Sequence, residues 1–339
     1  MKMLVTGGLG FIGAAFVRAV LRTGDHEVVN LDADTYAADR RRLEGISGPY
    51  RLEVVDIADA TTKDLIRNEA PDVIVHLAAE SHVTRSETQG DRFFRTNVEG
   101  TRNVLEAARA TDVALFVHVS TDEVYGPCAG DAFREDDKLP GEGAASSPYA
   151  RSKAVADDLA RACIGELPVT VVRPSNCIGP YQHPEKAVAR WITRALRGEP
   201  IPVWGDGGQV RDWMFVDDLC SALLLIVSRR LSGEVFNIAP EGTQITNLEM
   251  ATLVARAAGR DASDVYLTAY DRPAHDRRYA IDAARMRAAG WEPAHDLTVA
   301  VEKTVSWYDS HRAWWQGLVD EAESLYPDAQ QRGDQPAGR

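Results

Sequence analysis

Two groups of polar residues in the middle of the chain have types and spacing that suit acid–base chemistry. Thr121, Asp122 and Glu123 follow an apolar run, and Tyr149 and Lys153 lie four positions apart in a helical pattern. A spacing of four places two side chains on one face of a helix. A tyrosine phenol has a pKa of about 10, and a neighbouring ammonium stabilises its phenolate. The pair therefore predicts a base that takes a proton from a hydroxyl group.

Asp122 and Glu123 are adjacent carboxylates at the expected C-terminal end of a strand, the edge where catalytic groups of open α/β sheets gather. Alone, such a pair is typical of a solvated turn, and a Tyr/Lys pair is common on helix surfaces. Their combination with Thr121, which can hydrogen-bond a hydroxyl, favours a catalytic site. Two carboxylates can divide acid and base roles when their surroundings separate their pKa values.

A glycine-rich segment near the N-terminus indicates a dinucleotide site. Residues 6–13, TGGLGFIG, follow an apolar strand pattern and open a helical one. Its glycines allow a tight turn, close approach of a pyrophosphate and close packing of helix on strand, while the helix N-terminus supports the anion. The residues that we expect to contact the cofactor here are Gly7, Gly10, Phe11, Ile12 and Gly13.

Residues at the ends of later strands complete the predicted cofactor site. Asp32 ends the second strand, where its carboxylate can bind a ribose 2′-hydroxyl and repel a 2′-phosphate, which favours NAD over NADP. Arg40, Arg41 and Arg42 could hold a phosphate but fit a solvated helix face better. Asp56 and Ile57 are expected to contact the adenine, and Ala78 and Ala79 the nicotinamide. Tyr149 and Lys153 are expected both to contact the cofactor and to take part in catalysis.

Composition limits the class of protein. The 339 residues are 45% hydrophobic and 26% charged, as in one large or two modest globular domains. A net charge of −13 argues against nucleic acid or anionic membrane as the main partner. The four cysteines have neither metal-ligand nor redox spacing and read as free thiols, and no HExxH pattern or other metal site is present. With no signal-peptide pattern and no apolar run long enough to span a bilayer, we expect a cytoplasmic protein.

The periodicity predicts a doubly wound, mostly parallel Rossmann sheet. Short apolar runs alternate with helical patterns at Phe11–Thr23, Phe93–Ala110 and Ala150–Ile164. The strands are expected at Met3–Thr6, Val28–Leu31, Leu52–Val55, Val73–Leu77, Leu115–Ser120 and Val169–Arg173.

After Arg173, proline and glycine become frequent, which indicates a smaller, discontinuous α/β domain over the sheet. Helical patterns return at Val216–Arg229 and Asn247–Gly259, and a strand pattern occurs at Glu234–Ile238. We therefore expect an NAD-binding domain at 1–173 plus about 212–239, and a nucleotide-sugar-binding domain at 174–211 plus about 240–315. Residues 320–339, rich in Asp, Glu, Gln, Gly and Pro, are expected to be a flexible tail.

Seven segments of the chain resemble the dTDP-glucose 4,6-dehydratases of the extended short-chain dehydrogenase/reductase superfamily. The resemblance runs from about Met1 to Trp315. The glycine loop and YxxxK are shared by the whole superfamily, whereas the Asp-Glu pair, GPYQHPEK and RPAHDRRYA are more specific. The segments are TGGLGFIG (6–13), HLAAESHV (76–83), STDEVYG (120–126), SPYARSK (147–153), GPYQHPEK (179–186), GDGGQVRDW (205–213) and RPAHDRRYA (272–280).

The resemblance implies an NAD-dependent lyase with a three-step cycle. Tyr149 takes the proton from the hexose O4 while hydride passes from C4 to NAD. Glu123 then removes the acidified C5 proton, and Asp122 protonates the C6 hydroxyl, which leaves as water. Hydride finally returns to C6, which gives a 4-keto-6-deoxy sugar. The resemblance also implies a homodimer, with Phe93–Ala110 and Ala150–Ile164 forming a four-helix interface.

The resemblance further implies residues that contact the nucleotide-diphosphate hexose. Arg211 and Arg272 match phosphate-binding positions, and Glu185 could hydrogen-bond a glucose hydroxyl. A surface salt bridge or a helix cap is the competing interpretation for each of these residues. The remaining candidates for sugar, phosphate or nucleotide contacts are Ser81, His82, Asn176, Lys186, Asn247 and His275.

The chain departs from the family at three positions near the expected sugar pocket. Thr84 stands where the family usually has aspartate, and Cys177-Ile178 where it usually has Asn-Tyr. The nucleobase and hexose therefore stay open. Dehydration of a CDP-, UDP- or GDP-hexose, or epimerisation or decarboxylation on the same scaffold, are the alternatives. An NAD-binding regulator without catalysis is a remote one, because a binder needs none of Thr121, Tyr149 and Lys153.

Overall fold

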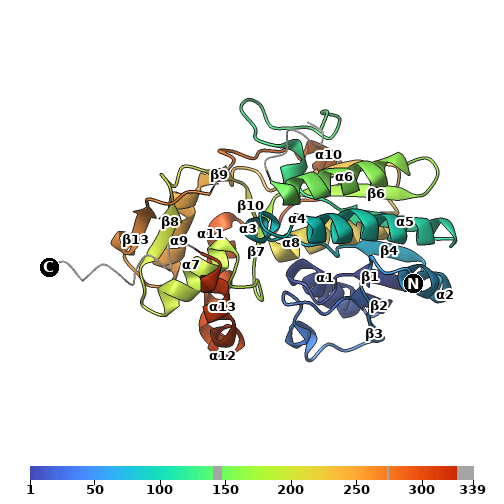
Figure 1. Ribbon diagram of the computed structural model, residues 1–339, viewed down its shortest axis with the longest axis horizontal. Helices are drawn as coiled ribbons and strands as arrows, with labels where there is room; N and C mark the ends of the chain where they lie inside the picture. The colour runs from blue at the N-terminus through green and yellow to red at the C-terminus, as the bar shows by residue number, and fades with distance from the viewer. Residues whose placement is uncertain (140–146, 273–274, 327–339) are drawn as a thin grey trace.

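The computed structural model describes residues 1–139, 147–272 and 275–326. Its centre is a seven-stranded parallel sheet in the order β3-β2-β1-β4-β5-β6-β11 (Figure 1). The order reverses between β1 and β4, as in dinucleotide-binding sheets. The strands of this sheet are β1 Lys2–Thr6, β2 Glu27–Asp32, β3 Tyr50–Val54, β4 Val73–His76, β5 Leu115–Val119, β6 Val169–Pro174 and β11 Val235–Ile238.

Helices cover both faces of the sheet, because the strands carry apolar residues on both sides. Val75 and Val117 pack with α1 and α8 in one core, whereas Ile74 and Phe116 pack with α5 and α6 in the other. This confirms the predicted doubly wound fold. The helical elements of this part are α1 Phe11–Arg22, η1 Arg40–Leu43, α2 Thr61–Glu69, α3 Val83–Ser86, α4 Gly90–Phe94, η2 Arg95–Gly100, α5 Thr101–Arg109, η3 Asp122–Tyr125, α6 Pro148–Ala162 and α8 Val216–Arg229.

The helix predicted at Phe93–Ala110 is not regular. It consists of α4, a π-helical segment η2 and α5. Within η2, the side chain of Asn97 accepts from the backbone N–H of Glu80 at 2.8 Å and donates to Ser152 of α6 at 2.8 Å. Wider turns of this kind are frequent at functional sites. Here the wider turn ties the loop after β4 to the helix that carries Tyr149.

A second region with its own apolar core lies beside the carboxyl edge of the sheet (Figure 1). Trp191, Met250, Tyr308 and Trp315 are among the buried residues that fill this core. Its elements are β7 Asn176–Ile178, α7 Ala187–Leu196, β8 Ile201–Trp204, β9 Val210–Arg211, β10 Trp213–Phe215, β12 Ile245–Thr246, α9 Asn247–Ala257, η4 Ala262–Asp264, β13 Val265–Thr268, α11 Leu297–Ser310, α12 Arg312–Trp315, η5 Gln316–Leu318 and α13 Val319–Ser324. Helix α10 Ala284–Ala288 lies instead against β11, and its Met286 is part of the core of the sheet. Within the described ranges, no helix is both long and apolar enough to cross a membrane.

The run Arg40–Arg42 is only partly the solvated face that the sequence suggests. Arg40 and Arg41 form exposed ion pairs with Asp34 and Asp39. Arg42 is buried instead, and donates to the carbonyl oxygens of Leu9, Ala37 and Tyr181. A buried guanidinium needs acceptors for its N–H groups, and here backbone oxygens supply them. Arg42 thereby fastens the glycine loop to the second region.

The prediction of a flexible tail from residue 320 is wrong for residues 320–326. Helix α13 begins at Val319, and Glu323 pairs with Arg190 and Arg194 of α7 at 2.7 and 3.0 Å. Tyr326 is buried. Two arginines that are themselves buried hold this acidic segment in place, a pairing that its composition alone does not reveal. Residues 327–339 lie outside the described residues.

A buried ion pair beneath the site is expected to dominate local stability. Arg173 of β6 and Asp157 of α6 are fully buried and joined by two hydrogen bonds of 2.7 and 2.9 Å. Asp157→Asn leaves a buried guanidinium without its counter-charge, so we expect the free energy of unfolding in urea to fall by about 3–5 kcal/mol. The neighbouring Asp158→Asn, which breaks the exposed pair with Arg161, is the control and should cost less than about 1 kcal/mol. Equal losses in the two variants would contradict this assignment.

Candidate active site

A cavity of about 740 Å³ opens at the carboxyl edge of the sheet, between the sheet and the second region. Strands β1, β2, β4, β5 and β6 end at its wall. Every site residue predicted from the sequence lines it, namely Gly7, Gly10, Phe11, Ile12, Gly13, Asp32, Asp56, Ile57, Ala78, Ala79, Ser81, His82, Thr121, Asp122, Glu123, Tyr149, Lys153, Asn176, Glu185, Lys186, Arg211, Asn247, Arg272 and His275.

The glycine loop forms a close-fitting cradle at one end of the cavity. Gly7 has φ +74°, and a Cβ there would lie 2.7 Å from the backbone of Ala78. A Cβ on Gly13 would lie 2.1 Å from the carbonyl oxygen of Gly7. Glycine is therefore required at both positions. The N-terminus of the 12-residue helix α1 follows directly and favours a bound anion such as a pyrophosphate.

Two carboxylates stand at this end of the cavity. Asp32 accepts from the backbone N–H of Leu9 at 2.8 Å and of Asp34 at 2.9 Å. Burial raises the pKa of Asp32, and these two hydrogen bonds oppose that effect. Asp56 caps the turn at Ala58 and pairs with Arg95. Both side chains are already oriented by the protein, as a site for ribose and adenine requires.

The end of β4 is fixed by a hydrogen-bonded chain of side chains. Thr6 Oγ1 accepts from the backbone N–H of Leu77 and Ala78, so its own hydroxyl hydrogen goes to Nδ1 of His76 at 2.7 Å. Nε2 of His76 therefore carries the proton and donates to Thr101 at 2.9 Å. Burial lowers the pKa of His76 to about 3, which keeps the ring neutral. This chain sets the small residues after β4 against the glycine loop.

Thr121, Asp122 and Glu123 lie together where β5 turns into η3. The hydroxyl of Thr121 caps η3 by accepting from the N–H of Glu123 at 3.3 Å, and donates to Asp122 at 3.2 Å. Burial and the neighbouring charge of Glu123 raise the pKa of Asp122 to about 8. Burial also raises the pKa of Glu123, but Arg272, Arg211 and Lys186 favour its charged form. The surroundings therefore favour a proton on Asp122 and a charge on Glu123.

Tyr149 and Lys153 enter the cavity from α6, which the side chain of Ser147 caps. Burial, together with the charges of Glu123 and Asp122, raises the pKa of Tyr149, while a hydrogen bond with Thr121 lowers it. Nζ of Lys153 donates to the carbonyl oxygen of Val119 at 2.8 Å, and burial lowers the pKa of Lys153 to about 8. As a base, Tyr149 would need further positive charge close to its oxygen.

Cations and polar groups line the other end of the cavity. Arg211 donates to the carbonyl oxygen of Asp276 at 2.8 Å and lies over the ring of Tyr279, 4.2 Å from its centroid. Nε of Arg272 and Oδ1 of Asn176 are buried and have no hydrogen-bond partner among the described residues. Buried polar atoms in native proteins are nearly always paired. These atoms therefore mark places for ligand groups.

Other predicted substrate contacts already have protein partners. Lys186 donates to the carbonyl oxygen of Ser81 at 2.7 Å, and His275 pairs with Asp271 at 2.6 Å. The carboxylate of Glu185, expected to meet a glucose hydroxyl, instead accepts from Tyr36 and Arg85. Any contact of Glu185 with a sugar would compete with these two donors.

Sequence reasoning missed several aromatic side chains of the cavity wall, among them Trp204, Tyr279 and Tyr326. Trp204 lies with ring centroids 5.3 Å from Tyr326 and 6.4 Å from His275. Tyr279 donates to Asp276 at 2.5 Å and reaches Glu123 at 3.5 Å. The signal for Trp204 is its place directly before the glycine turn 205–208. No sequence signal pointed to Tyr326, because the composition of its segment is typical of a flexible tail.

The three departures from the family pattern are not equivalent. Thr84 and Cys177 line the cavity. Ile178 lies in the apolar core of the second region and is fully buried. The expectation that all three lie at the sugar pocket is therefore wrong for Ile178, whose side chain points to the opposite side of the short strand β7 from its neighbour Cys177.

Known proteins are similar to this chain over most of its length. Residues 3–239 match the NAD dependent epimerase/dehydratase family. The dTDP-glucose 4,6-dehydratase of Streptomyces griseus is 44% identical over 94% of this chain and 97% of its own. The low-salt glycan biosynthesis protein Agl12 of Haloferax volcanii is 43% identical over 91% of this chain and 98% of its own.

The solved structures agree with the sequence relatives. The crystal structure of the dTDP-glucose 4,6-dehydratase DesIV from Streptomyces venezuelae, with NAD bound, superposes with a TM-score of 0.87 at 39% identity, over 94% of this chain and 100% of that one. With the glycine cradle, the YxxxK helix and the paired carboxylates in one cavity, the chain belongs to the NAD-dependent epimerase/dehydratase family and, within it, to the dTDP-glucose 4,6-dehydratases.

Proposed function

We propose that this protein converts dTDP-glucose to dTDP-4-keto-6-deoxyglucose and water. The observation that carries the proposal is the position of Asp122 and Glu123 side by side, next to Tyr149, in a cavity whose other end is the glycine cradle. Elimination of water needs both an acid and a base, and these two carboxylates have surroundings that separate their protonation states.

Each catalytic side chain has a distinct task in this reaction. The glycine cradle would hold NAD, which would supply the hydride acceptor for C4, the hydride donor for C6 and positive charge beside Tyr149. Tyr149 takes the O4 proton, while Thr121 hydrogen-bonds the same hydroxyl and Lys153 favours the phenolate. Glu123 removes the C5 proton and Asp122 donates a proton to O6.

The opposite end of the cavity suits a nucleoside diphosphate. Arg211, Arg272 and Lys186 would neutralise the diphosphate, with Asn176 and Asn247 as polar contacts. The ring of Trp204 offers a flat face for the base. Stacking on an aromatic ring discriminates poorly among bases. The proposed preference for thymidine therefore rests on similarity to relatives that are dTDP-glucose 4,6-dehydratases.

Purified protein incubated with dTDP-glucose tests the proposal directly. Mass spectrometry should show loss of the mass of one water, with no net consumption of NAD. CDP-, UDP- and GDP-glucose are run in parallel. Conversion of one of these in place of dTDP-glucose would support the alternative, a dehydratase for another nucleotide-bound hexose. That alternative is favoured by Thr84 and Cys177, two departures from the family pattern that line the cavity. Epimerisation without loss of water, or NAD binding without turnover, would refute a dehydratase.

The pH dependence of the reaction should show the loss of the proton from Asp122. Because burial raises its pKa to about 8, the acid form that the elimination needs predominates below that pH and is lost above it. We therefore expect kcat/KM to fall as the pH rises through about 8. Asp122→Asn cannot titrate, so its residual activity should lack this alkaline decline. The same decline in Asp122→Asn would assign it to another group.

We also propose a cytoplasmic homodimer with the domain division expected above, except that α10 belongs with the sheet and α13 with the second domain. Four free thiols fit a reducing compartment. Helices α5 and α6 lie side by side on one face of the sheet (Figure 1), so a second copy could meet both at once. Light scattering after gel filtration should give twice the chain mass of 37.1 kDa, and the single mass would exclude the dimer.

A further inference from the structure

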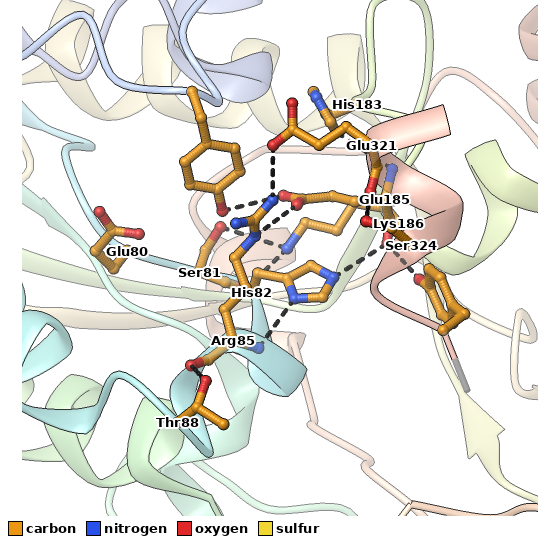
Figure 2. Close-up of polar contacts among 12 residues, drawn as sticks. Glu80, Ser81, His82, Arg85, Thr88, His183, Glu185, Lys186, Glu321 and Ser324 are labelled. Atoms are coloured by element: carbon orange, nitrogen blue, oxygen red, sulfur yellow. Dashed lines mark hydrogen bonds and ion pairs between the residues drawn. The ribbon is translucent and has the colours of Figure 1, made fainter. Parts of the chain in front are cut away.

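The side chain of Arg85 lies outside the catalytic set and joins three separate parts of the chain. It projects from α3 and donates through Nε to the carboxylate of Glu185 at 3.2 Å. Its other end pairs with Glu321 of α13 at 3.3 Å. Its guanidinium also lies over the ring of Tyr36, 3.9 Å from the centroid. Figure 2 shows Arg85 between Glu185 and Glu321, with Lys186 beside them.

The two ion pairs of Arg85 have different surroundings. The side chain of Glu185 is 2% exposed, whereas that of Glu321 is 63% exposed. An exposed pair contributes little, but a buried carboxylate that loses its partner must find another or take up a proton. Besides Arg85, the hydroxyl of Tyr36 reaches the Glu185 carboxylate, at 3.3 Å.

The backbone of Glu185 is held as firmly as its carboxylate. Its carbonyl oxygen accepts from Nε2 of His82 at 3.2 Å and from the hydroxyl of Tyr326. The next residue is Lys186, whose ammonium lies in the cavity wall and reaches Ser81. Glu185 therefore sits between a cation that binds it, Arg85, and a neighbouring cation that it could attract, Lys186.

We propose that Arg85 is a positioning residue for substrate binding: by holding the Glu185 carboxylate, it leaves the Lys186 ammonium available to the bound substrate. This rests on the proposed function. Enclosure in the cavity lowers the pKa of Lys186, and the Glu185 carboxylate is the main group that opposes this effect. Without Arg85, the free carboxylate would pair with Lys186 and withdraw that cation from the substrate.

Arg85→Gln should therefore weaken substrate binding without impairing the chemistry. We expect KM for dTDP-glucose to rise about tenfold to a hundredfold, as for loss of one charged contact, with kcat nearly unchanged. Isothermal titration with dTDP-glucose in a Tyr149→Phe background, in which oxidation at C4 is also blocked, should give the same fold-change in Kd. Glu321→Gln, which breaks only the exposed pair of Arg85, is the control and should leave KM unchanged.

The decisive variant is Arg85→Gln combined with Glu185→Gln. Removing the Glu185 charge takes away the group that would pair with Lys186, so Arg85→Gln should have no further effect in a Glu185→Gln background. The double variant should therefore match Glu185→Gln alone in KM and Kd. An effect of Arg85→Gln that persists in the Glu185→Gln background, or a fall in kcat instead of binding, would overturn the proposal.

Two measurements separate failure of this inference from other failures. Arg85→Lys keeps the charge but loses the planar fork, so it should show a smaller rise in KM that Glu185→Gln again removes. If Arg85→Gln does not fold, Arg85→Lys with and without Glu185→Gln provides the same test. If wild-type protein binds dTDP-glucose but does not dehydrate it, the proposed function fails while the Kd series still tests Arg85.

Discussion

Glu123→Gln is expected to lower the rate of product formation by about a hundredfold to ten-thousandfold, the range for loss of a general base. The glutamine keeps the shape of the side chain but cannot take the C5 proton. Oxidation at C4 should continue, so substrate should produce the absorbance of reduced nicotinamide without loss of water. In deuterated water, the wild-type protein should introduce deuterium at C5 and the variant should not.

Glu135→Gln is the matched control for this result. Glu135 is a buried glutamate that accepts from the backbone N–H of Asn237 at 3.0 Å and does not line the cavity. This variant should retain turnover in its folded fraction. Dehydration at the wild-type rate by Glu123→Gln would show that another group is the base at C5.

Tyr149→Phe is expected to stop the reaction at an earlier point. Without the phenol oxygen, the proton of O4 has no acceptor, so hydride transfer from C4 should slow by about a hundredfold to ten-thousandfold. Stopped-flow absorbance after mixing with substrate should then show no reduced nicotinamide. The absorbance of reduced nicotinamide therefore distinguishes the two variants, because Glu123→Gln accumulates the reduced cofactor and Tyr149→Phe does not.

The control for Tyr149→Phe is Tyr125→Phe. Tyr125 lies close by in η3, and its hydroxyl donates to Asn237 at 2.9 Å and accepts from Arg173 at 2.6 Å. It does not line the cavity, so its loss should reduce stability but leave the rate of nicotinamide reduction intact. A fast burst of reduction in Tyr149→Phe would remove Tyr149 from its role at O4.

The parts of this protein that sequence predicted well depend on contacts within short segments. The strand–glycine loop–helix at residues 2–22 and the Tyr149/Lys153 spacing are set by local backbone geometry and helical period. The sheet order brings the ends of successive strands to one edge. Asp32 and the Thr121–Glu123 turn could therefore be placed at the cavity without knowledge of any distant contact.

The parts that sequence missed depend on pairs far apart in the chain. Arg85 and Glu185 are 100 positions apart, and Glu185 and Tyr326 are 141 apart. An acidic stretch such as the one around Glu323 looks unstructured until the buried arginines of α7 are seen beside it. Likewise, the burial of Arg42 depends on a carbonyl oxygen at residue 181. No local pattern encodes these partners.

The position of Tyr326 in the cavity wall has a consequence for the growing chain on the ribosome. The last strand of the sheet, β11, ends at Ile238, so the sheet can form while translation continues. At about 5–20 residues per second, Tyr326 follows on the order of ten seconds later. Until then the nascent protein has a complete cradle for its cofactor but an open wall on the substrate side. Cofactor capture can therefore precede substrate binding during synthesis, and a chain released early would hold NAD without its full active site.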